Sequence, residues 1–338
     1  MKAASGRLAD LGHRRPLVAS GYGISAGGKV LLALAGAWPM VLLARFTDRV
    51  GKGLRGPPRD AIIADDTTSG DRGRAFGFHR AADTAGAVVG PLVGLGVYHL
   101  VGEQFRPLLW IAVIPAVVSV AFVFLIRERP HPRLRSEQRA WSLAGLPRRF
   151  WRVIALIALF SAVNFPDTLI LLRATEVGLG FAGVVVLYVL YNLSYALLSY
   201  PAGVVSDRRS RSVVFAVGLC LFALTYLGLG LELSAGWLWV LLPLYGGYTA
   251  LTDGVSRAWI ADLVPGAQRG TGLGIHAAVS GVGLLVAGVW AGLAWGRVGR
   301  IPFLISGATA AVLAVAILLS RSHLGAGGSQ VAEGPPAA

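Results

Sequence analysis

A stripe of basic residues runs through the apolar segment 38–64. Its cations are Arg45, Arg49, Lys52, Arg55 and Arg59. Spacings of three and four place them on one face of a helix. An ion facing lipid costs several kcal/mol, so the stripe predicts a water-filled cavity with carboxylate partners, of which Asp48 and Asp60 are nearest. An excess of cations around a cavity predicts a substrate with a carboxylate, phosphate or other anionic group.

The same segment contains residues that interrupt helical hydrogen bonding. They are Gly51, Gly53, Gly56, Pro57 and Pro58. They predict a broken helix at membrane depth, which is a common way to build a transport site. The alternative is an external loop over 45–60, which would place a strongly basic loop on the wrong side of the membrane.

Further ionisable residues are expected to be buried at membrane depth. They are Lys29, Arg80, Asp83, Asp167, Asp253 and Arg257. Asp83 is the favoured proton carrier, because burial and nearby arginines act in opposite directions on its ionisation; a static Asp–Arg clamp is the alternative. Asp167, beside Asn164 and Pro166, is the second candidate, or else a hydrogen-bonded structural residue.

The composition determines what kind of element must position these residues. Of the 338 residues, 55% are apolar, a further 45 are glycines, and only 14% are charged. This predicts an all-α integral membrane protein and excludes a soluble, disordered or disulfide-bonded chain, with Cys220 as the single cysteine. The predicted spans are 16–35, 38–64, 75–98, 107–126, 153–172, 181–204, 213–231, 237–262, 271–294 and 301–320.

The distribution of the 31 basic residues predicts the orientation and the domains. They gather in alternate loops beginning with the amino terminus, which places both termini in the cytoplasm. The predicted domains are an incomplete four-helix bundle over 1–126, a cytoplasmic linker over 127–150, a six-helix bundle over 151–320 and a disordered tail over 321–338.

The chain repeats itself at an offset of 197 residues, the separation of Asp10 from Asp207. The matched positions are Gly6, Asp10 and Arg14 with Gly203, Asp207 and Arg211, and Ala64, Asp65, Arg72, Gly73, Gly77 and His79 with Ala261, Asp262, Arg269, Gly270, Gly274 and His276. The spans 153–172 and 181–204 have no counterpart in the first half. We therefore expect that two amino-terminal helices are absent from a protein built as six plus six. The alternative is a true ten-helix protein with an irregular repeat.

These motifs resemble those of the major facilitator superfamily, whose loop after the second helix reads approximately G-x-L-A-D-R-x-G-R-R. The matching residues are Gly6, Leu8, Ala9, Asp10, Arg14 and Arg15, with Leu11 and His13 departing, and the second copy runs from Gly203 to Arg211. The resemblance implies two six-helix bundles and an aspartate in each copy that latches neighbouring helices. It also implies that Arg45 or Arg49 corresponds to an arginine linked to proton movement.

A second motif has the spacing G-x8-G-x3-G-P-x2-G. It consists of Gly77, Gly86, Gly90, Pro91 and Gly94. Such glycines let a neighbouring backbone approach closely, and the proline permits a kink. A generic small-residue packing stripe is the alternative. Antiporters of the superfamily carry this motif in their fifth helix, so the resemblance implies export in exchange for protons.

The sequence thus predicts a secondary active transporter of the inner or plasma membrane. It is expected to work by alternating access and to couple the efflux of a small anionic molecule to protons, with lipid, substrate and protons as partners. No enzyme activity, cofactor, metal or nucleic acid is expected.

Two other readings remain. The chain is a non-transporting remnant or a partner-dependent subunit, or it is a membrane-embedded enzyme. Asp253-Gly254-x-x-Arg257 is similar to the D-G-x-x-A-R motif of phosphoalcohol transferases. Its alanine and arginine are transposed, and 266–290 has no paired aspartates, so the enzyme reading is disfavoured.

Overall fold

The structure is a computed structural model that describes residues 1–102, 104–126, 146–231, 234–296 and 299–320. Its α-helices are α1 (Lys2–Leu11), α2 (Arg14–Leu34), α3 (Trp38–Asp65), α4 (Arg72–Leu100), α5 (Phe105–Val123), α6 (Arg148–Ser161), α7 (Asp167–Glu176), α8 (Phe181–Arg208), α9 (Arg211–Gly230), α10 (Leu238–Leu263), α11 (Arg269–Leu293) and α12 (Arg300–Leu319). No strand occurs within these ranges. Helices satisfy their backbone N–H and C=O groups internally, which lipid requires. The all-α prediction is confirmed.

Most predicted spans coincide with one helix each. Seven helices in the described ranges, α2, α4, α5, α8, α9, α11 and α12, are long and apolar enough to cross a membrane. The predicted span 153–172 is instead divided into α6 and α7, with Asn164, Phe165 and Pro166 between them. Pro166 disfavours helical geometry at the residue before it, so the chain turns there and starts α7 afresh.

The prediction of a broken helix over 38–64 is wrong, and so is the loop alternative over 45–60. Helix α3 continues from Trp38 to Asp65 through its glycines and prolines. Gly51 serves packing rather than a break, whereas an added Cβ at Gly56 would meet no described atom within 4 Å. A Cβ on Gly51 would lie 2.5 Å from the carbonyl oxygen of Gly21 on α2. The absent side chains therefore let α2 and α3 lie close together along a continuous helix.

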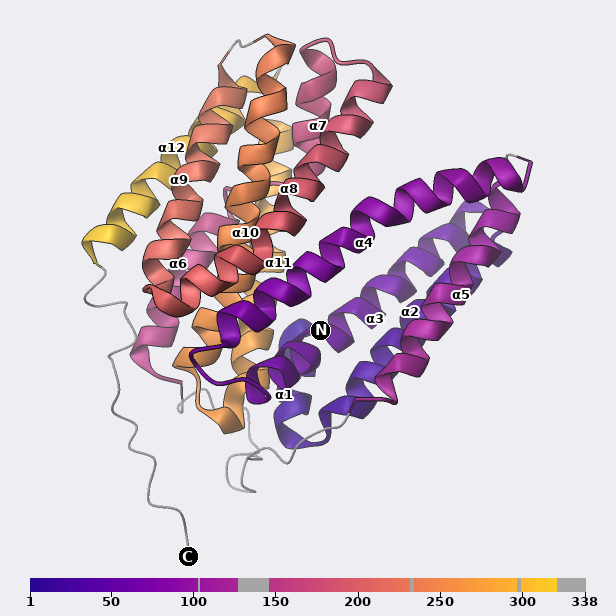
Figure 1. The fold of residues 1–338 in the computed structure, drawn as a ribbon, viewed down its shortest axis with the longest axis horizontal. Helices are drawn as coiled ribbons and strands as arrows, with labels where there is room; N and C mark the ends of the chain where they lie inside the picture. The colour runs from indigo at the N-terminus through magenta and orange to yellow at the C-terminus, as the bar shows by residue number, and fades with distance from the viewer. Residues whose placement is uncertain (103, 127–145, 232–233, 297–298, 321–338) are drawn as a thin grey trace, which may run out of the picture.

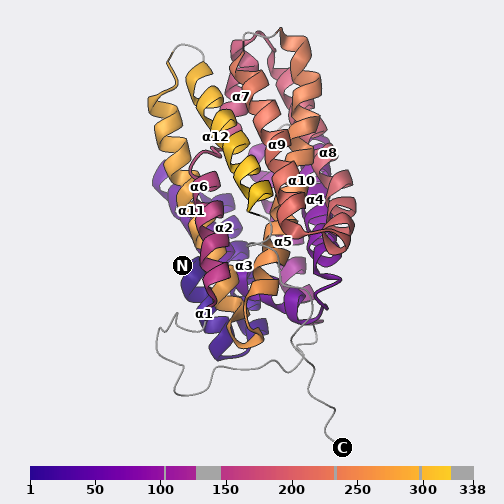
Figure 2. The same ribbon diagram turned by 90° about the vertical axis from the view of Figure 1, so that its left-hand side faces the viewer.

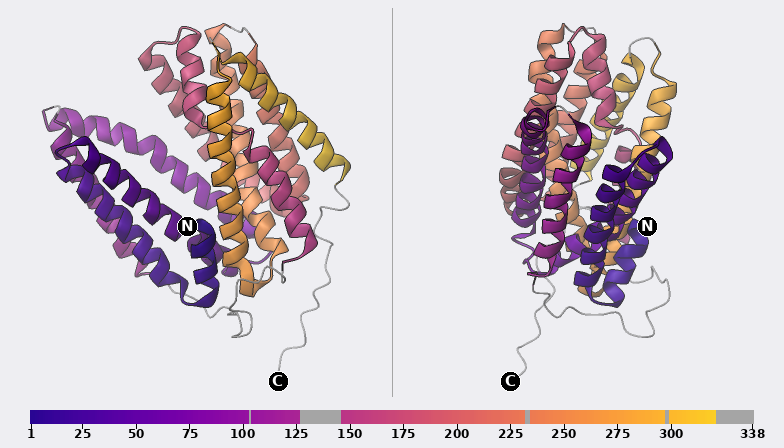
Figure 3. Two further views of the ribbon diagram at one scale, coloured as in Figure 1. Left: turned by 180° about the vertical axis from the view of Figure 1, so that it is seen from behind. Right: turned by 90° about the vertical axis from the view of Figure 1, so that its right-hand side faces the viewer.

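The helices form two bundles, α1 to α5 and α6 to α12, arranged as a V (Figure 1). They meet where α1 packs against α11 and α4 packs against α8, and we call this the closed end. Away from it the bundles diverge toward an open end, as the view from behind also shows (Figure 3, left), whereas the bundles overlap in the side view (Figure 2). The predicted linker 127–150 lies largely outside the described residues, and the predicted tail 321–338 lies wholly outside them.

The two bundles repeat one plan, as the 197-residue offset predicts. Helices α2, α3, α4 and α5 correspond to α9, α10, α11 and α12, and α1 corresponds to the last part of α8. The contacts between the bundles obey the same symmetry, because α4 packs on α8 and α10 while α11 packs on α1 and α3. Helices α6, α7 and the first part of α8 have no counterpart among the described residues of the first bundle.

Paired glycines allow the bundles to touch at the closed end. A Cβ on Gly6 would lie 2.1 Å from the carbonyl oxygen of Gly270, and one on Gly203 would lie 2.2 Å from that of Gly73. Real Cβ atoms do not tolerate such distances, so both helix crossings require glycine.

The glycine motif of α4 packs closely only at its first position. A Cβ on Gly77 would lie 2.4 Å from the carbonyl oxygen of Ser199, which confirms the predicted close approach there. At Gly86, Gly90 and Gly94 an added Cβ would meet no described atom within 4 Å, so the prediction is wrong for these three in this conformation. The side chain of Pro91 lies outside the described part of the chain.

These crossings predict that Gly203→Ala destabilises the protein while Gly86→Ala does not. The added methyl group at Gly203 must displace backbone, a change that costs about 1 to 3 kcal/mol. We expect the thermal unfolding midpoint of the purified protein in detergent to fall by about 3 °C or more. Equal midpoints for the two variants would contradict the crossing.

Candidate functional site

At the closed end, one aspartate from each bundle caps a helix of the other bundle. Asp10, at the end of α1, accepts hydrogen bonds from the backbone N–H groups of Gly270 (2.8 Å) and Thr271 (2.6 Å) at the start of α11. These N–H groups lack partners within their own helix, and the helix dipole favours a negative charge beside them. Asp10 is fully buried, so this contact ties the two bundles together in a water-poor place.

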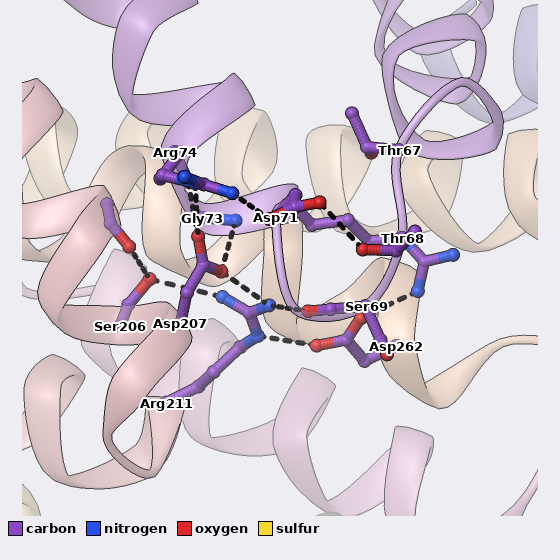
Figure 4. A network of polar contacts seen from close by, with 12 residues as sticks. Thr67, Thr68, Ser69, Asp71, Gly73, Arg74, Ser206, Asp207, Arg211 and Asp262 are labelled. Carbon is purple, nitrogen blue, oxygen red and sulfur yellow. Dashed lines mark hydrogen bonds and ion pairs between the residues drawn. The ribbon is translucent and has the colours of Figure 1, made fainter.

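The second copy repeats this contact in the opposite direction. Asp207, at the end of α8, accepts from the N–H groups of Gly73 (2.7 Å) and Arg74 (2.8 Å) at the start of α4 (Figure 4). We call the two contacts together the crossed clamp. The prediction that these aspartates contact neighbouring helices thus corresponds to four charge-assisted hydrogen bonds.

An arginine and a further aspartate brace each half of the crossed clamp. Arg211 lies between Asp207 (3.1 Å) and Asp262, and its guanidinium also donates to the carbonyl oxygen of Ser69 at 2.8 Å (Figure 4). Arg72 of the first bundle reaches the same Asp262 at 2.7 Å. Because each carboxylate serves arginines from different helices, the network holds its helices in one arrangement.

The first copy has the same bracing residues at the matched positions. Arg14 pairs with Asp65 and lies 3.6 Å from Asp10, and Arg269 of the second bundle also pairs with Asp65. The symmetry therefore extends from the backbone to individual ion pairs.

At the start of α4, an exposed aspartate adds local order. Asp71 accepts from the Thr68 hydroxyl at 2.9 Å and pairs with Arg74. These two contacts hold the pKa of the Asp71 carboxyl below its usual range. The group stays ionised next to the clamp at neutral pH.

A second group of charges joins the bundles nearer the middle of the protein, and we call it the central cluster. It consists of Arg59, Asp60, Arg80, Asp83, Asp253 and Arg257. Arg257 on α10 lies 2.9 Å from Asp253 and 3.5 Å from Asp60 on α3. Arg80 on α4 lies 3.5 Å from Asp253, which also accepts from the Tyr195 hydroxyl at 2.7 Å. Charges from α3, α4 and α10 thus meet here, together with a hydroxyl group from α8.

A cavity of about 270 Å³ adjoins the central cluster. Its polar lining includes Lys2, Asn164, Asp253, Arg257 and His276, from α1, the α6–α7 break, α10 and α11. Aromatic rings such as Phe160 and Tyr248 complete the wall. One guanidinium nitrogen of Arg257, Nη1, is buried and has no hydrogen-bond partner in the described structure. The cavity therefore combines apolar surface with an arginine that still has N–H groups to donate.

The basic stripe of α3 lies apart from this cavity. Arg45, Arg49 and Lys52 are exposed, and Lys52 pairs with Asp48 at 2.8 Å. Arg55 instead lies over the ring of Tyr22, 3.9 Å from its centre. Both predicted carboxylates thus pair with a cation of the stripe: Asp48 pairs with Lys52, and Asp60 pairs with Arg59.

Two residues expected to be buried are exposed. Lys29 on α2 is one, and Asp83 is the other, with 59% of its side chain accessible. Asp83 pairs with Arg80 at 3.3 Å, which corresponds to the Asp–Arg clamp that was the alternative to a proton carrier. Helix α4 packs mainly on α8 and α10 and hardly touches α3 and α5 of its own bundle, which leaves part of its surface uncovered.

Sequence reasoning missed several neighbours of the site. Tyr195, Tyr248 and Lys2 were not singled out, although Tyr188, Tyr191 and Tyr195 follow one another at helical spacing. The repeat offset does point to Asp65 and Asp262, because both are matched positions beside an arginine motif. The tyrosines named above were not among the positions matched by the repeat, so the repeat gave no reason to single them out.

Two helical bundles that repeat one plan, are joined by ion pairs and share a partly polar cavity are typical of a membrane transporter. The family profile of the Major Facilitator Superfamily matches residues 1–188 and 168–336, and the chain belongs to this family of transporters. It is therefore an integral membrane protein that lies in a lipid bilayer and moves a small molecule.

Relatives of known sequence or structure agree with this assignment. The chain is 31% identical over 312 residues to an uncharacterised MFS-type transporter of Methanocaldococcus jannaschii, covering 90% of this chain and 78% of the relative. It is 25% identical to the multidrug resistance protein MdtH of Edwardsiella ictaluri, covering 84% of this chain and 70% of MdtH. The crystal structure of the human organic anion transporter MFSD10 has the same fold, with a TM-score of 0.76, 18% identity, and coverage of 94% of this chain and 80% of that one.

The crossed clamp predicts that each aspartate protects amides of the other bundle. In Asp10→Asn, hydrogen–deuterium exchange is expected to accelerate at the start of α11, because an amide NH₂ group then faces one of the backbone N–H groups. In Asp207→Asn, it should accelerate at the start of α4. Loss of one charge-assisted hydrogen bond is worth about 1.5 to 3 kcal/mol, which corresponds to about tenfold or more in local opening.

Asp48→Asn is the control, since Asp48 pairs within α3 and touches neither helix start. Exchange that accelerates only within the substituted bundle would contradict the crossed arrangement.

Proposed function

We propose that this protein exports a small organic anion in exchange for protons, by alternating access across the inner or plasma membrane. The observation that carries the proposal is Arg257, which lies in the wall of a cavity of the second bundle that Lys2 of the first bundle also lines, and which has one buried guanidinium nitrogen without a partner in the described structure. A cavity that both bundles line can be exposed first to one side of the membrane and then to the other when the bundles move relative to each other.

The positions of the basic residues support a cytoplasmic location for the closed end and both termini. Among the described loops and helix ends, the closed end carries Arg14, Arg15, Arg72, Arg74, Arg208, Arg209, Arg211 and Arg269. Short loops rich in arginine stay on the cytoplasmic side. In this orientation the V opens outward, and the structure corresponds to the outward-facing state of the cycle.

The charge balance around the bundle interface supports an anionic substrate. In the central cluster the arginines and aspartates balance, but Lys2 adds a cation to the cavity wall. On α3, no described carboxylate lies within ion-pair distance of Arg49 or Arg55. An anion that reaches the cavity or the α3 face meets an excess of positive charge and fork-shaped donors.

Export and proton coupling draw support from the chain's relatives and motifs. MdtH is named as a multidrug resistance protein, and MFSD10 as an organic anion transporter. The glycine motif from Gly77 to Gly94 resembles that of antiporters. Exchange requires that the clamp at the closed end closes after substrate has entered from the cytoplasm, and that it opens again only after a proton has replaced the substrate on the outer side.

The proposal predicts discrimination between two permanently charged probes that share a benzene ring. In proteoliposomes with an imposed pH gradient, benzenesulfonate should be transported against its concentration gradient, and phenyltrimethylammonium should not. Neither probe titrates or crosses lipid freely, so the difference reports charge selection. Equal handling of the two probes, or benzenesulfonate transport that ignores the pH gradient, would overturn the proposal.

Arg257→Gln is expected to lower the rate of benzenesulfonate transport by about tenfold or more, because it removes a charged hydrogen bond to the substrate. Arg257→Lys keeps the charge and should retain more activity. Arg45→Gln is the matched control, since Arg45 is exposed and does not line the cavity. The unfolding midpoint of each variant separates a transport defect from misfolding.

A further inference from the structure

The carboxyl group of Asp167 is bound by tyrosines alone. Asp167 is the first residue of α7, directly after the break at Pro166. One of its oxygens accepts from the Tyr245 hydroxyl at 2.7 Å, and the other accepts from the Tyr191 hydroxyl at 3.2 Å. These tyrosines come from α10 and α8, so three helices of the second bundle converge on this carboxyl group.

The other aspartates in the interior have a basic partner. Arginines lie within 4 Å of Asp10, Asp60, Asp65, Asp207, Asp253 and Asp262. No ion pair links Asp167 to any residue in the described ranges. Asp167 thus lacks the basic partner that stabilises the ionised form of the other carboxylates.

The groups that face Asp167 from the helices around it are uncharged. They are Tyr191 on α8, Tyr226 on α9, and Tyr245 and Tyr248 on α10. The nearest arginine along α7, Arg173, donates instead to the carbonyl oxygens of Leu229 and Leu231 and lies 3.8 Å from Glu176. The charge of an ionised Asp167 would therefore be balanced by hydroxyl dipoles only.

An ionised carboxylate without a counter-ion is costly in a membrane protein, whereas its neutral form is not. With a proton bound, the carboxyl group becomes a donor, and the hydroxyl oxygen of Tyr191 is placed to accept it. The Tyr245 hydroxyl continues to donate to the other oxygen. Both protonation states therefore keep two hydrogen bonds, and only the ionised state carries an uncompensated charge.

The geometry selects a proton over a larger cation. The cavity of about 270 Å³ reaches Asn164 and Tyr248 but does not include Asp167. Among the described residues, no group of three or more acidic, histidine or cysteine side chains is placed to hold a metal ion, so Asp167 has no companions for one. A proton needs no such space.

A row of tyrosines connects this carboxyl group to the central cluster. Tyr191 and Tyr195 lie one turn apart on α8, with ring centres 6.4 Å apart and planes inclined by 15°. The Tyr195 hydroxyl donates to Asp253 at 2.7 Å. Protonation of Asp167 alters its hydrogen bond with the Tyr191 hydroxyl. The ring of Tyr195 is stacked on the ring of Tyr191, so a shift of Tyr191 is passed to Tyr195.

We propose that Asp167 is a proton-binding site of the second bundle and that Tyr191 and Tyr195 link its protonation to the Asp253–Arg257 pair. Its role in coupling rests on the proposed proton-driven transport. Proton binding itself does not depend on that function. The site lies apart from the anion-binding arginine, so proton and substrate occupy different places in the same bundle.

Infrared spectroscopy of the full chain in lipid nanodiscs tests the site directly. At neutral pH, the wild type should show the carbonyl stretching band of a protonated carboxyl group, and alkaline titration should remove it. Asp167→Asn should lack the band, and Asp83→Asn should keep it. Tyr191→Phe should shift the band to higher frequency, because the carboxyl group loses one hydrogen bond. A band that survives in Asp167→Asn, or no band in the wild type, would overturn the proposal.

The transport assay separates this inference from the proposed function. If benzenesulfonate transport by the wild type ignores the pH gradient, the proposed function fails, whatever the infrared band shows. If the wild type is coupled and Asp167→Asn remains equally coupled, the coupling role of Asp167 fails while the proposed function stands. Asp167→Glu, which retains the carboxyl group, should keep both the band and the coupling, and its unfolding midpoint checks the fold.

Discussion

The closed end depends on one interaction made twice: a buried carboxylate caps the start of a helix in the other bundle. Asp10 holds α11 and Asp207 holds α4. Each contact requires the helices to approach closely, which the paired glycines at the crossings permit. Because the two contacts are related by symmetry and span the same interface, neither bundle can tilt without breaking both. In the proposed alternating-access cycle, this interface would break and re-form as a unit.

The interior follows a strict electrostatic rule. Removing an ion from water is expensive, so the charges inside the protein occur as networks in which each carboxylate has an arginine. Two residues of the second bundle depart from this pattern or leave it incomplete. Asp167 has hydroxyl partners in place of a cation. Arg257 keeps a buried nitrogen without a partner in the described structure, as Arg80 and Arg269 do, but it is the one of these three that lines the cavity. An incomplete network marks a place that a substrate or a proton can complete.

Sequence reasoning succeeded where the repeat supplied an internal check. The offset that relates Asp10 to Asp207 also located Asp65 and Asp262, and the structure places all four in equivalent contacts. It failed where a single residue type has two uses. Gly51 indicated a break in α3, yet it serves close packing against α2. Spacing alone does not distinguish a glycine that bends a helix from one that admits a neighbour.

By itself, the sequence determined the membrane environment, the all-α class, the two-fold plan and the family. These follow from composition, periodicity and motif spacing, which are properties of the chain alone. Only the tertiary structure decided which charges are paired, that Asp83 is exposed, and that Tyr191 and Tyr245 converge on Asp167. The reason is that burial and ion pairing depend on distances between helices far apart in the chain. Helical periodicity fixes the face on which a residue lies, but the packing of the bundles fixes what lies opposite.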